Sequence, residues 1–227
     1  MEKESTRKIE VRQKVLAANE EAARELRRRF ELRGTAVVNL ISSPGSGKTS
    51  LLEATLPRLQ GYAVGVLEGD IATERDAERI RRLGVRAHQI LTGGACHLDA
   101  RQIDRELAIS GMEGFDFLFI ENVGNLICPA SYDLGEDFKV ALLSVTEGDD
   151  KPFKYPGIFS RSAVSVISKC DLLPHVRFDL RSVEDQIRSL NPSVQLFRTS
   201  AQTGEGIADW CRFLSDWLET KRGRSGA

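Results

Sequence analysis

Apolar residues follow two patterns along this chain, and the two patterns alternate. Short runs are almost continuously apolar, and they occupy residues 35–41, 62–67, 85–91, 117–121, 140–145, 163–167 and 194–199. Between them, apolar residues recur every three or four positions at 51–56, 73–83, 98–107, 179–190 and 207–218. Continuous runs predict parallel strands covered on both faces, and the wider spacing predicts amphipathic helices. The alternation predicts an α/β fold with a doubly wound, mostly parallel sheet.

A long amphipathic helix is expected ahead of the first strand. Between residues 9 and 32, apolar side chains recur at helical spacing amid many Arg and Glu, at Val15, Leu16, Ala22, Leu26 and Phe30. Residues 221–227 are rich in Gly and Arg, and we expect a flexible tail there. We therefore divide the chain into an N-terminal helix (1–33), one globular domain (34–220) and the tail (221–227).

The composition limits the classes of partner. The formal net charge is −1, with 41% hydrophobic and 29% charged residues, and this balance implies neither nucleic acid nor an anionic membrane surface. No apolar signal core follows Met1, and no run approaches the ~18 consecutive apolar residues that span a bilayer. We expect a cytoplasmic protein with no nucleic-acid or membrane partner. Four cysteines in such a chain point to packing, metal binding or catalysis.

The first apolar run leads directly into a glycine-rich turn at residues 42–50. A turn of this kind between a strand and a helix binds phosphate through its backbone N–H groups and the helix N-terminus. Ser42 stands where the usual pattern has glycine, but the strand before it and the helical pattern after it supply the required context. The sequence therefore predicts a P-loop NTPase whose nucleotide phosphates are held by Gly45, Ser46, Gly47, Lys48, Thr49 and Ser50. Lys48 would reach the β- and γ-oxygens, and the Thr49 hydroxyl would bind Mg²⁺.

Acidic residues end two of the predicted strands. Asp70 follows the second apolar run, and Glu121 ends the run at 117–121. Phosphoryl hydrolysis needs Mg²⁺ held by oxygen ligands beside the γ-phosphate, so Asp70 and Glu121 are candidate magnesium ligands with Thr49 and candidate catalytic residues with Lys48. The alternative for each acid is a helix N-cap or a solvated loop position. Gly124 follows, and its backbone N–H is placed to sense the γ-phosphate in a switch segment.

A second nucleotide-binding element follows the run at 163–167. Ser168-Lys169-Cys170-Asp171 is similar to the Asn-Lys-x-Asp guanine reader of GTPases, with Ser168 in place of Asn. The Asp171 carboxylate can accept hydrogen bonds from guanine N1 and N2, while the Lys169 stem lies along the base. Ser200 and Ala201, which leave a later strand, match the second guanine-side loop. An ordinary strand-exit turn is the alternative, but the two elements together favour GTP and GDP over adenine nucleotides.

Two cysteines and a histidine form the other candidate site. Cys96 and His97 are adjacent, and Cys128 follows the switch segment. Thiolate and imidazole ligands suit Zn²⁺ or Ni²⁺, but three ligands fall short of a closed tetrahedral site, which a second subunit could complete. The alternative is a buried thiol beside a histidine at a helix N-terminus. For Cys170 and Cys211 we expect packing roles.

These residues closely resemble the HypB family, the nickel-incorporation GTPases of nickel–iron hydrogenase maturation. The resemblance covers nearly the whole chain from the N-terminal helix onward. Its most specific stretches are residues 43–49, 68–70 with 76–79, 92–100, 121–129 and 146–151.

The resemblance implies GTP hydrolysis, GTP-linked homodimerisation and a metal bound by Cys96, His97 and Cys128 at the subunit interface. It also implies delivery of Ni²⁺ to a hydrogenase large-subunit precursor together with a partner nickel metallochaperone. Many members of the family carry an N-terminal Cys-rich motif or a His-rich tract, and residues 1–32 contain neither Cys nor His. The internal site is thus the candidate nickel site in this chain.

Three other functions are compatible with these motifs. The urease-maturation GTPases are related, but they resemble residues 96–100 less well. A GTP-dependent assembly scaffold would share the nucleotide site and lack a metal-transfer role. A small-molecule P-loop kinase would transfer the phosphoryl group to a substrate, and the element at 168–171 favours a GTPase over it.

Overall fold

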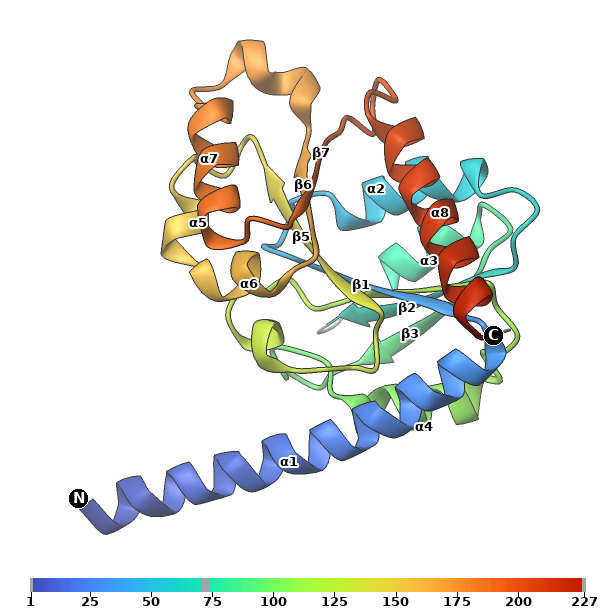
Figure 1. Cartoon of the computed structure of the whole chain (residues 1–227), viewed down its shortest axis with the longest axis vertical. Coiled ribbons are helices and arrows are strands. Elements are labelled where there is room, and N and C mark those ends of the chain that lie inside the picture. Colours follow the sequence, from blue (N-terminus) through green and yellow to red (C-terminus); the bar gives the residue numbers. More distant parts are fainter. Residues whose placement is uncertain (1, 71–73, 226–227) are drawn as a thin grey trace.

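The computed structural model describes residues 2–70 and 74–225. Within them, a seven-stranded sheet has the order β3-β2-β4-β1-β5-β6-β7, and each neighbouring pair is parallel (Figure 1). The strands are β1 (Ala36–Ser42), β2 (Val64–Asp70), β3 (Arg86–Leu91), β4 (Phe117–Glu121), β5 (Phe138–Ser144), β6 (Val164–Ser168) and β7 (Gln195–Arg198). This sheet confirms the predicted fold class.

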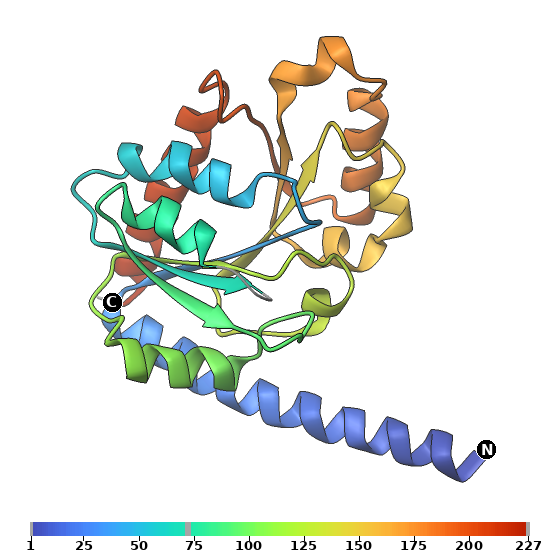
Figure 2. The same ribbon diagram turned by 180° about the vertical axis from the view of Figure 1, so that it is seen from behind.

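Helices cover both faces of the sheet (Figures 1 and 2). One face carries α2 (Lys48–Thr55), α3 (Arg75–Arg81) and α8 (Ile207–Ser225). The other face carries α1 (Glu2–Arg33) and α4 (Ala100–Ser110) at one end, and α6 (Pro156–Arg161) and α7 (Leu180–Leu190) at the other. The short segments are α5 (Lys151–Lys154), η1 (Leu56–Arg58), η2 (Cys128–Ser131) and η3 (Cys170–His175). None of the described helices is both long enough and apolar enough to cross a lipid bilayer.

Burial of the central strand β1 on both faces explains why its sequence is almost continuously apolar. All seven of its residues are buried. Val38 and Leu40 pack on the α2/α8 face, whereas Val37 packs with α1 and α4 and Ile41 packs with α6 and α7. Because successive side chains of a strand point to opposite faces, a strand covered on both faces needs apolar residues at nearly every position.

Helix α1 spans Glu2–Arg33, within the expected N-terminal helix at 1–33. Its N-terminal half extends past α4 and away from the sheet (Figures 1 and 2). Val15, expected on the apolar face, is 41% exposed, whereas Leu26 and Phe30 are buried. The buried face of α1 therefore lies toward its C-terminal end. The helix expected at 73–83 is shorter, since α3 spans Arg75–Arg81, and residue 73 lies outside the described residues.

The structure also differs from the expected flexible tail. Helix α8 continues to Ser225, and residues 226–227 lie outside the described part of the chain. The Lys221 ammonium donates to both carboxylate oxygens of Asp137, at 2.6 and 2.7 Å, and to the Thr35 carbonyl at 2.7 Å. Asp137 in turn accepts from the Val37 backbone N–H. This partly buried ion pair anchors the end of α8 to β1, and composition alone carries no signal of it.

Gly206, just before α8, is expected to be the position of this fold least tolerant of a side chain. Its φ is +68°, and a Cβ there would lie 1.8 Å from the Arg198 carbonyl oxygen. Gly206→Ala should therefore lower the free energy of unfolding by about 2 kcal/mol or more, from left-handed strain and overpacking together. Urea denaturation measures the change. Gly157→Ala in α6, where a Cβ meets nothing within 4 Å, is the matched control, and equal stability of the two variants would contradict the prediction.

Candidate functional site

The carboxyl ends of β1, β2 and β4 meet at the glycine-rich turn. The turn joins β1 to α2, so Lys48 and Thr49 open the helix. The buried Lys48 ammonium lies 3.2 Å from the Ser42 hydroxyl oxygen and 3.8 Å from the Glu121 carboxylate. The Thr49 hydroxyl donates to the same Glu121 oxygen at 3.0 Å. The structure thus brings together the loop lysine, the loop threonine and the strand-end acid that the sequence singled out.

Glu68 adds a second buried acid that the sequence analysis missed. It lies beside Glu121 in the β2–β4 register, and the two side chains are 2% and 5% exposed. Burial, followed by the Glu121 charge, raises the pKa of Glu68 well above its usual range. Burial also raises the pKa of Glu121, although the Lys48 charge opposes the shift. Glu68 lies two residues before Asp70 and so on the same face of β2, which is the signal that could have identified it.

The two buried acids each carry an unsatisfied oxygen. Glu68 Oε1 and Glu121 Oε2 have no hydrogen-bond partner among the described residues. Buried polar atoms are normally paired, so an oxygen left over in each carboxylate fits a site for a hard cation such as Mg²⁺. Asp70 ends β2 and lines the same cleft, as do Thr49 and Glu121.

Two clefts meet at the P-loop. The first, which we call the phosphate cleft, is lined by residues of the loop, by the strand-end acids and by Gly124. The second, the base cleft, has a volume of about 420 Å³, and its lining includes Ser168, Asp171 and Ala201. Gly47, Ser50 and Lys169 line both clefts. The Lys169 ammonium donates to the Gly45 carbonyl at 2.7 Å, so this lysine lies across the loop between the clefts.

Hydrogen bonds hold the base cleft against the P-loop. The Ser168 hydroxyl donates to the Ser46 carbonyl at 2.6 Å, and the Ser200 hydroxyl donates to Asp171 Oδ1 at 2.5 Å. The Cys170 backbone N–H donates to the Thr199 carbonyl. Lys169 has a φ of 59°, a conformation that is uncommon for residues other than glycine. The two loops expected to read a base are therefore joined to each other and to the phosphate loop.

Three further residues around the P-loop were not foreseen. The Arg79 guanidinium lines the phosphate cleft and bonds Glu53 through two nitrogens, at 3.0 and 2.6 Å, while also reaching the Ser50 hydroxyl. Glu147 accepts from the Ser46 hydroxyl at 2.6 Å. Residues 76–79 and 146–151 had been noted for their resemblance alone, and neither stretch carries a motif whose spacing assigns such contacts.

Gly124 lies against the P-loop. A Cβ at this position would meet Pro44 Cγ at 2.9 Å and the Pro44 backbone at 3.0 Å. Only glycine permits this close approach, because a real Cβ is not found within 3.0 Å of another heavy atom. The segment that follows β4 is therefore in direct contact with the loop that would hold the phosphates.

Cys96, His97 and Cys128 form a cluster whose ligand atoms all lie within 4.8 Å of one another. The Cys96 sulfur is 3.4 Å from His97 Nδ1, and the His97 ring packs against the Tyr132 ring, tilted by 41°, at 3.9 Å between centroids. Interaction with the Cys128 thiol raises the pKa of Cys96, and burial lowers the pKa of His97, which favours the neutral, ligating imidazole. Two thiols and an imidazole suit a borderline or soft cation such as Ni²⁺ or Zn²⁺.

The structure does not support the alternative reading of this cluster as a packed thiol beside a helical histidine. Cys96 is exposed. Helix α4 begins only at Ala100, with Asp99 as its N-cap and Gln102 closing a capping box, so Cys96 and His97 lie in the loop before it. Cys170 and Cys211 are buried, in agreement with the expected packing roles.

Known proteins share this sequence and arrangement. The sequence profile of the CobW/HypB/UreG nucleotide-binding domain matches residues 36–198. The hydrogenase maturation factor HypB of Azotobacter chroococcum mcd 1 is 48% identical over 221 residues, which cover 96% of this chain and 70% of that protein. The HypB of Escherichia coli (strain K12) is 48% identical over 217 residues, which cover 95% of this chain and 73% of that protein.

A solved structure agrees with both sequence comparisons. The crystal structure of HypB from Helicobacter pylori in complex with nickel superposes with a TM-score of 0.84 at 43% identity, covering 92% of this chain and 97% of that one. These matches confirm the resemblance drawn from the motifs. The chain therefore belongs to the CobW/HypB/UreG nucleotide-binding family and, within it, to the HypB hydrogenase maturation factors.

Proposed function

We propose that this protein is a Mg²⁺-dependent GTPase that couples GTP binding and hydrolysis to dimerisation and to nickel binding and delivery during nickel–iron hydrogenase maturation. The observation that carries the proposal is the path of one segment, residues 121–128. It begins at Glu121 beside Lys48 and Thr49, touches the P-loop at Gly124 and ends at Cys128 in the thiol–imidazole cluster. A backbone displacement at the phosphate cleft is therefore transmitted to Cys128 through one short, continuous segment of the chain.

We propose the following roles for residues of the phosphate cleft. Gly45, Ser46 and Gly47 offer backbone N–H groups to the phosphates, and Thr49, Asp70 and Glu121 would hold Mg²⁺. Bound Mg²⁺ neutralises charge on the β- and γ-phosphates. Arg79 lines the cleft, but its guanidinium is already paired with Glu53 and Asp76. We therefore expect slow hydrolysis in the absence of a partner, since a free catalytic arginine supplies about 10³- to 10⁵-fold in rate.

The base preference provides the test of the nucleotide assignment. Asp171 lines the base cleft and accepts a hydrogen bond from Ser200, which supports the proposal that its carboxylate accepts two hydrogen bonds from guanine. Asp171→Asn should weaken GTP binding about 10- to 150-fold, since a hydrogen bond to a charged group is worth about 1.5 to 3 kcal/mol. The same variant should gain affinity for xanthosine nucleotides, whose base presents the complementary acceptor.

Calorimetric titration with GTP, ATP and xanthosine triphosphate measures this preference. Asp185→Asn, the same change at an exposed acid of α7 outside the base cleft, is the control and should bind like the wild type. Equal affinity of the wild-type protein for ATP and GTP would refute the guanine assignment.

The metal cluster supports the nickel part of the proposal. Each chain offers three recognised ligands, Cys96, His97 and Cys128, so water or a second chain must complete the coordination sphere. A two-fold axis through this surface would bring two such sets together in a homodimer. Nickel is then the cargo, held in one nucleotide state and passed in the other to a hydrogenase large-subunit precursor with the help of a nickel metallochaperone in the cytoplasm. Zn²⁺ is the competing cation for this ligand set.

A further inference from the structure

The end of β4 faces two sites at once. Glu121 lies on the α2 side of the sheet, where it contacts Lys48 and Thr49. Asn122 continues the strand pairing by donating its backbone N–H to Leu40, and its side chain points to the opposite face. The Glu121 side chain therefore faces the phosphate cleft and the Asn122 side chain contacts Leu98 in the packing of α1 and α4, while Asn122 also contributes to the lining of the phosphate cleft.

The Asn122 side chain holds the loop that carries two of the metal ligands. It is 1% exposed, and its Oδ1 accepts from the Leu98 backbone N–H at 3.2 Å and from the Val123 backbone N–H at 3.0 Å. Leu98 directly follows His97 and is fully buried. A buried N–H that loses its acceptor destabilises the structure, so the loop follows Asn122 when the end of β4 shifts.

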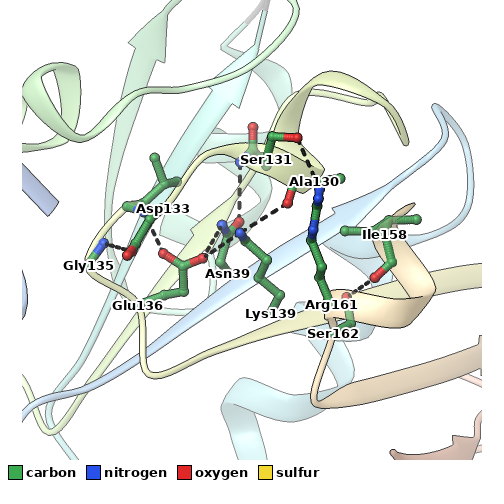
Figure 3. Close-up of polar contacts among 12 residues, drawn as sticks. Asn39, Ala130, Ser131, Asp133, Gly135, Glu136, Lys139, Ile158, Arg161 and Ser162 are labelled. Atoms are coloured by element: carbon green, nitrogen blue, oxygen red, sulfur yellow. Dashed lines mark hydrogen bonds and ion pairs between the residues drawn. The ribbon is translucent and has the colours of Figure 1, made fainter. Parts of the chain in front are cut away.

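A second buried layer fixes the orientation of the Asn122 amide. Asn122 Nδ2 donates to Asn39 Oδ1 at 3.3 Å, and Asn39 Nδ2 donates to Glu136 Oε1 at 3.4 Å. Figure 3 shows that Asn39, Glu136 and Lys139 converge, and the Lys139 ammonium also reaches the Ala130 carbonyl at 3.4 Å. Ala130 lies in the same short 3₁₀ helix as Cys128. The network behind Asn122 thus ends beside the third metal ligand.

Asn125 links the two segments that carry the metal ligands. Its Nδ2 donates to the Cys96 carbonyl at 3.3 Å, and its Oδ1 accepts from the backbone N–H groups of Ile127 and Cys128, at 2.8 and 3.4 Å. Both ligand segments are therefore hydrogen-bonded to the segment that leaves β4.

We propose that Asn122 is the positioning residue that ties the Cys96–His97 loop to the nucleotide-sensing end of β4, with Asn39 holding its amide in the required orientation. The inference deepens the proposed function and rests on it. A displacement of residues 121–124 by the γ-phosphate moves Asn122, and Leu98 and the adjacent His97 move with it. The nucleotide state then sets the geometry of all three metal ligands, including the two outside the switch segment.

The test compares the ratio of Ni²⁺ affinities in the GDP state and in a state loaded with a non-hydrolysable GTP analogue. The wild-type ratio should be about fivefold or greater, and Asn122→Ala should reduce it to within about twofold of unity. Asn39→Leu, which removes the oxygen that accepts from Asn122, should also reduce the ratio. Asn191→Ala is the matched control, because the Asn191 Oδ1 also accepts from a backbone N–H, that of Ser193, while its Nδ2 donates to the Ser162 carbonyl, far along the sheet beside β6.

Amide hydrogen exchange in the wild-type protein gives a readout that needs no variant. The Leu98 amide should exchange at rates that differ about tenfold or more between the two nucleotide states, whereas the Ser193 amide, which bonds Asn191, should not respond. An unchanged affinity ratio in Asn122→Ala, or a Leu98 amide insensitive to nucleotide, overturns this inference while leaving the GTPase and metal assignments standing. Absence of GTP or Ni²⁺ binding in the wild type instead overturns the proposed function.

Discussion

Replacing Lys48 with alanine is expected to abolish measurable binding of GTP and GDP. Lys48 is 8% exposed, opens α2 and lines the phosphate cleft. A lysine there contributes charge-assisted hydrogen bonds to the β- and γ-phosphates, each worth about 1.5 to 3 kcal/mol. Loss of two such bonds weakens binding about 10²- to 10⁴-fold, which takes a micromolar ligand beyond calorimetric detection.

The control for this variant must separate lost binding from lost folding. Lys48 also lies beside the buried Glu121 carboxylate, so its removal affects the apo protein as well. Circular dichroism should show a folded variant, and its melting temperature should no longer rise on addition of GDP with Mg²⁺. Lys154→Ala, which removes an exposed lysine of α5 paired with Asp150, should bind nucleotide like the wild type. Near wild-type GTP affinity in Lys48→Ala would show that the P-loop assignment is wrong.

The fold could be predicted from the sequence because its central strands are covered on both faces. Burial at every position of β1 produces a nearly continuous apolar run, and such a run identifies a parallel strand without any knowledge of its neighbours. The glycine-rich turn is equally local, since strand, turn and helix follow one another directly in the chain. The carboxyl ends of parallel strands meet at one edge, so Asp70 and Glu121 could be placed near Lys48 before the structure was known.

The features that could not be predicted depend on contacts between distant parts of the chain. Glu68 is an ordinary strand residue until the β2–β4 register sets it beside Glu121. Lys221 belongs to a segment of flexible composition, and its ordering depends on Asp137, which directly precedes β5. Asn39 interrupts one apolar run and Asn122 follows another, for a reason that only their mutual hydrogen bond reveals. A sequence pattern indicates where a polar residue lies along its own strand, but it does not indicate which residue faces it on the neighbouring strand.

The metal cluster could be predicted only in part from the sequence. Two thiols and an imidazole were singled out by chemistry, but their spacing alone left a packing role open. The structure brings the three side chains together through the arrangement of β3, β2 and β4, whose carboxyl ends lie next to one another in the sheet. The loop after β3 carries Cys96 and His97, the segment after β4 carries Cys128, and the two therefore meet.

Cys96→Ala and Cys128→Ala are each expected to weaken Ni²⁺ and Zn²⁺ binding by more than about 100-fold. Loss of a ligand should exceed the 10- to 100-fold loss that removal of an outer-shell partner causes. Cys211→Ala is the matched control, because its thiol is buried in the core and burial raises its pKa to about 11. That variant should keep its metal affinity. Competition titrations with a chromophoric chelator measure all three, each loaded with GDP or with a non-hydrolysable GTP analogue.

Metal affinity should also fall as the pH falls, because protons compete with the metal for its ligands. A metal binds the thiolate, whereas the Cys128 thiol raises the pKa of Cys96 above its ordinary value of 9.0. Protons therefore compete at Cys96 throughout the range below that value. His97 adds competition only under more acidic conditions, because burial lowers its pKa from 6.5.

The nucleotide dependence of the metal affinity decides between the nickel-delivery function and a GTP-dependent scaffold. Residues 121–128 join the phosphate cleft to Cys128, so delivery requires that the wild-type affinity differ between the GDP and GTP-analogue states. The two cysteine variants should still bind and hydrolyse GTP, since neither side chain lines the phosphate or base cleft. Unchanged metal binding in both variants, or identical wild-type affinities in the two states, would favour the scaffold. A fall in metal affinity confined to Cys96→Ala and Cys128→Ala, together with a nucleotide-dependent wild type, would establish that the GTPase cycle controls the metal.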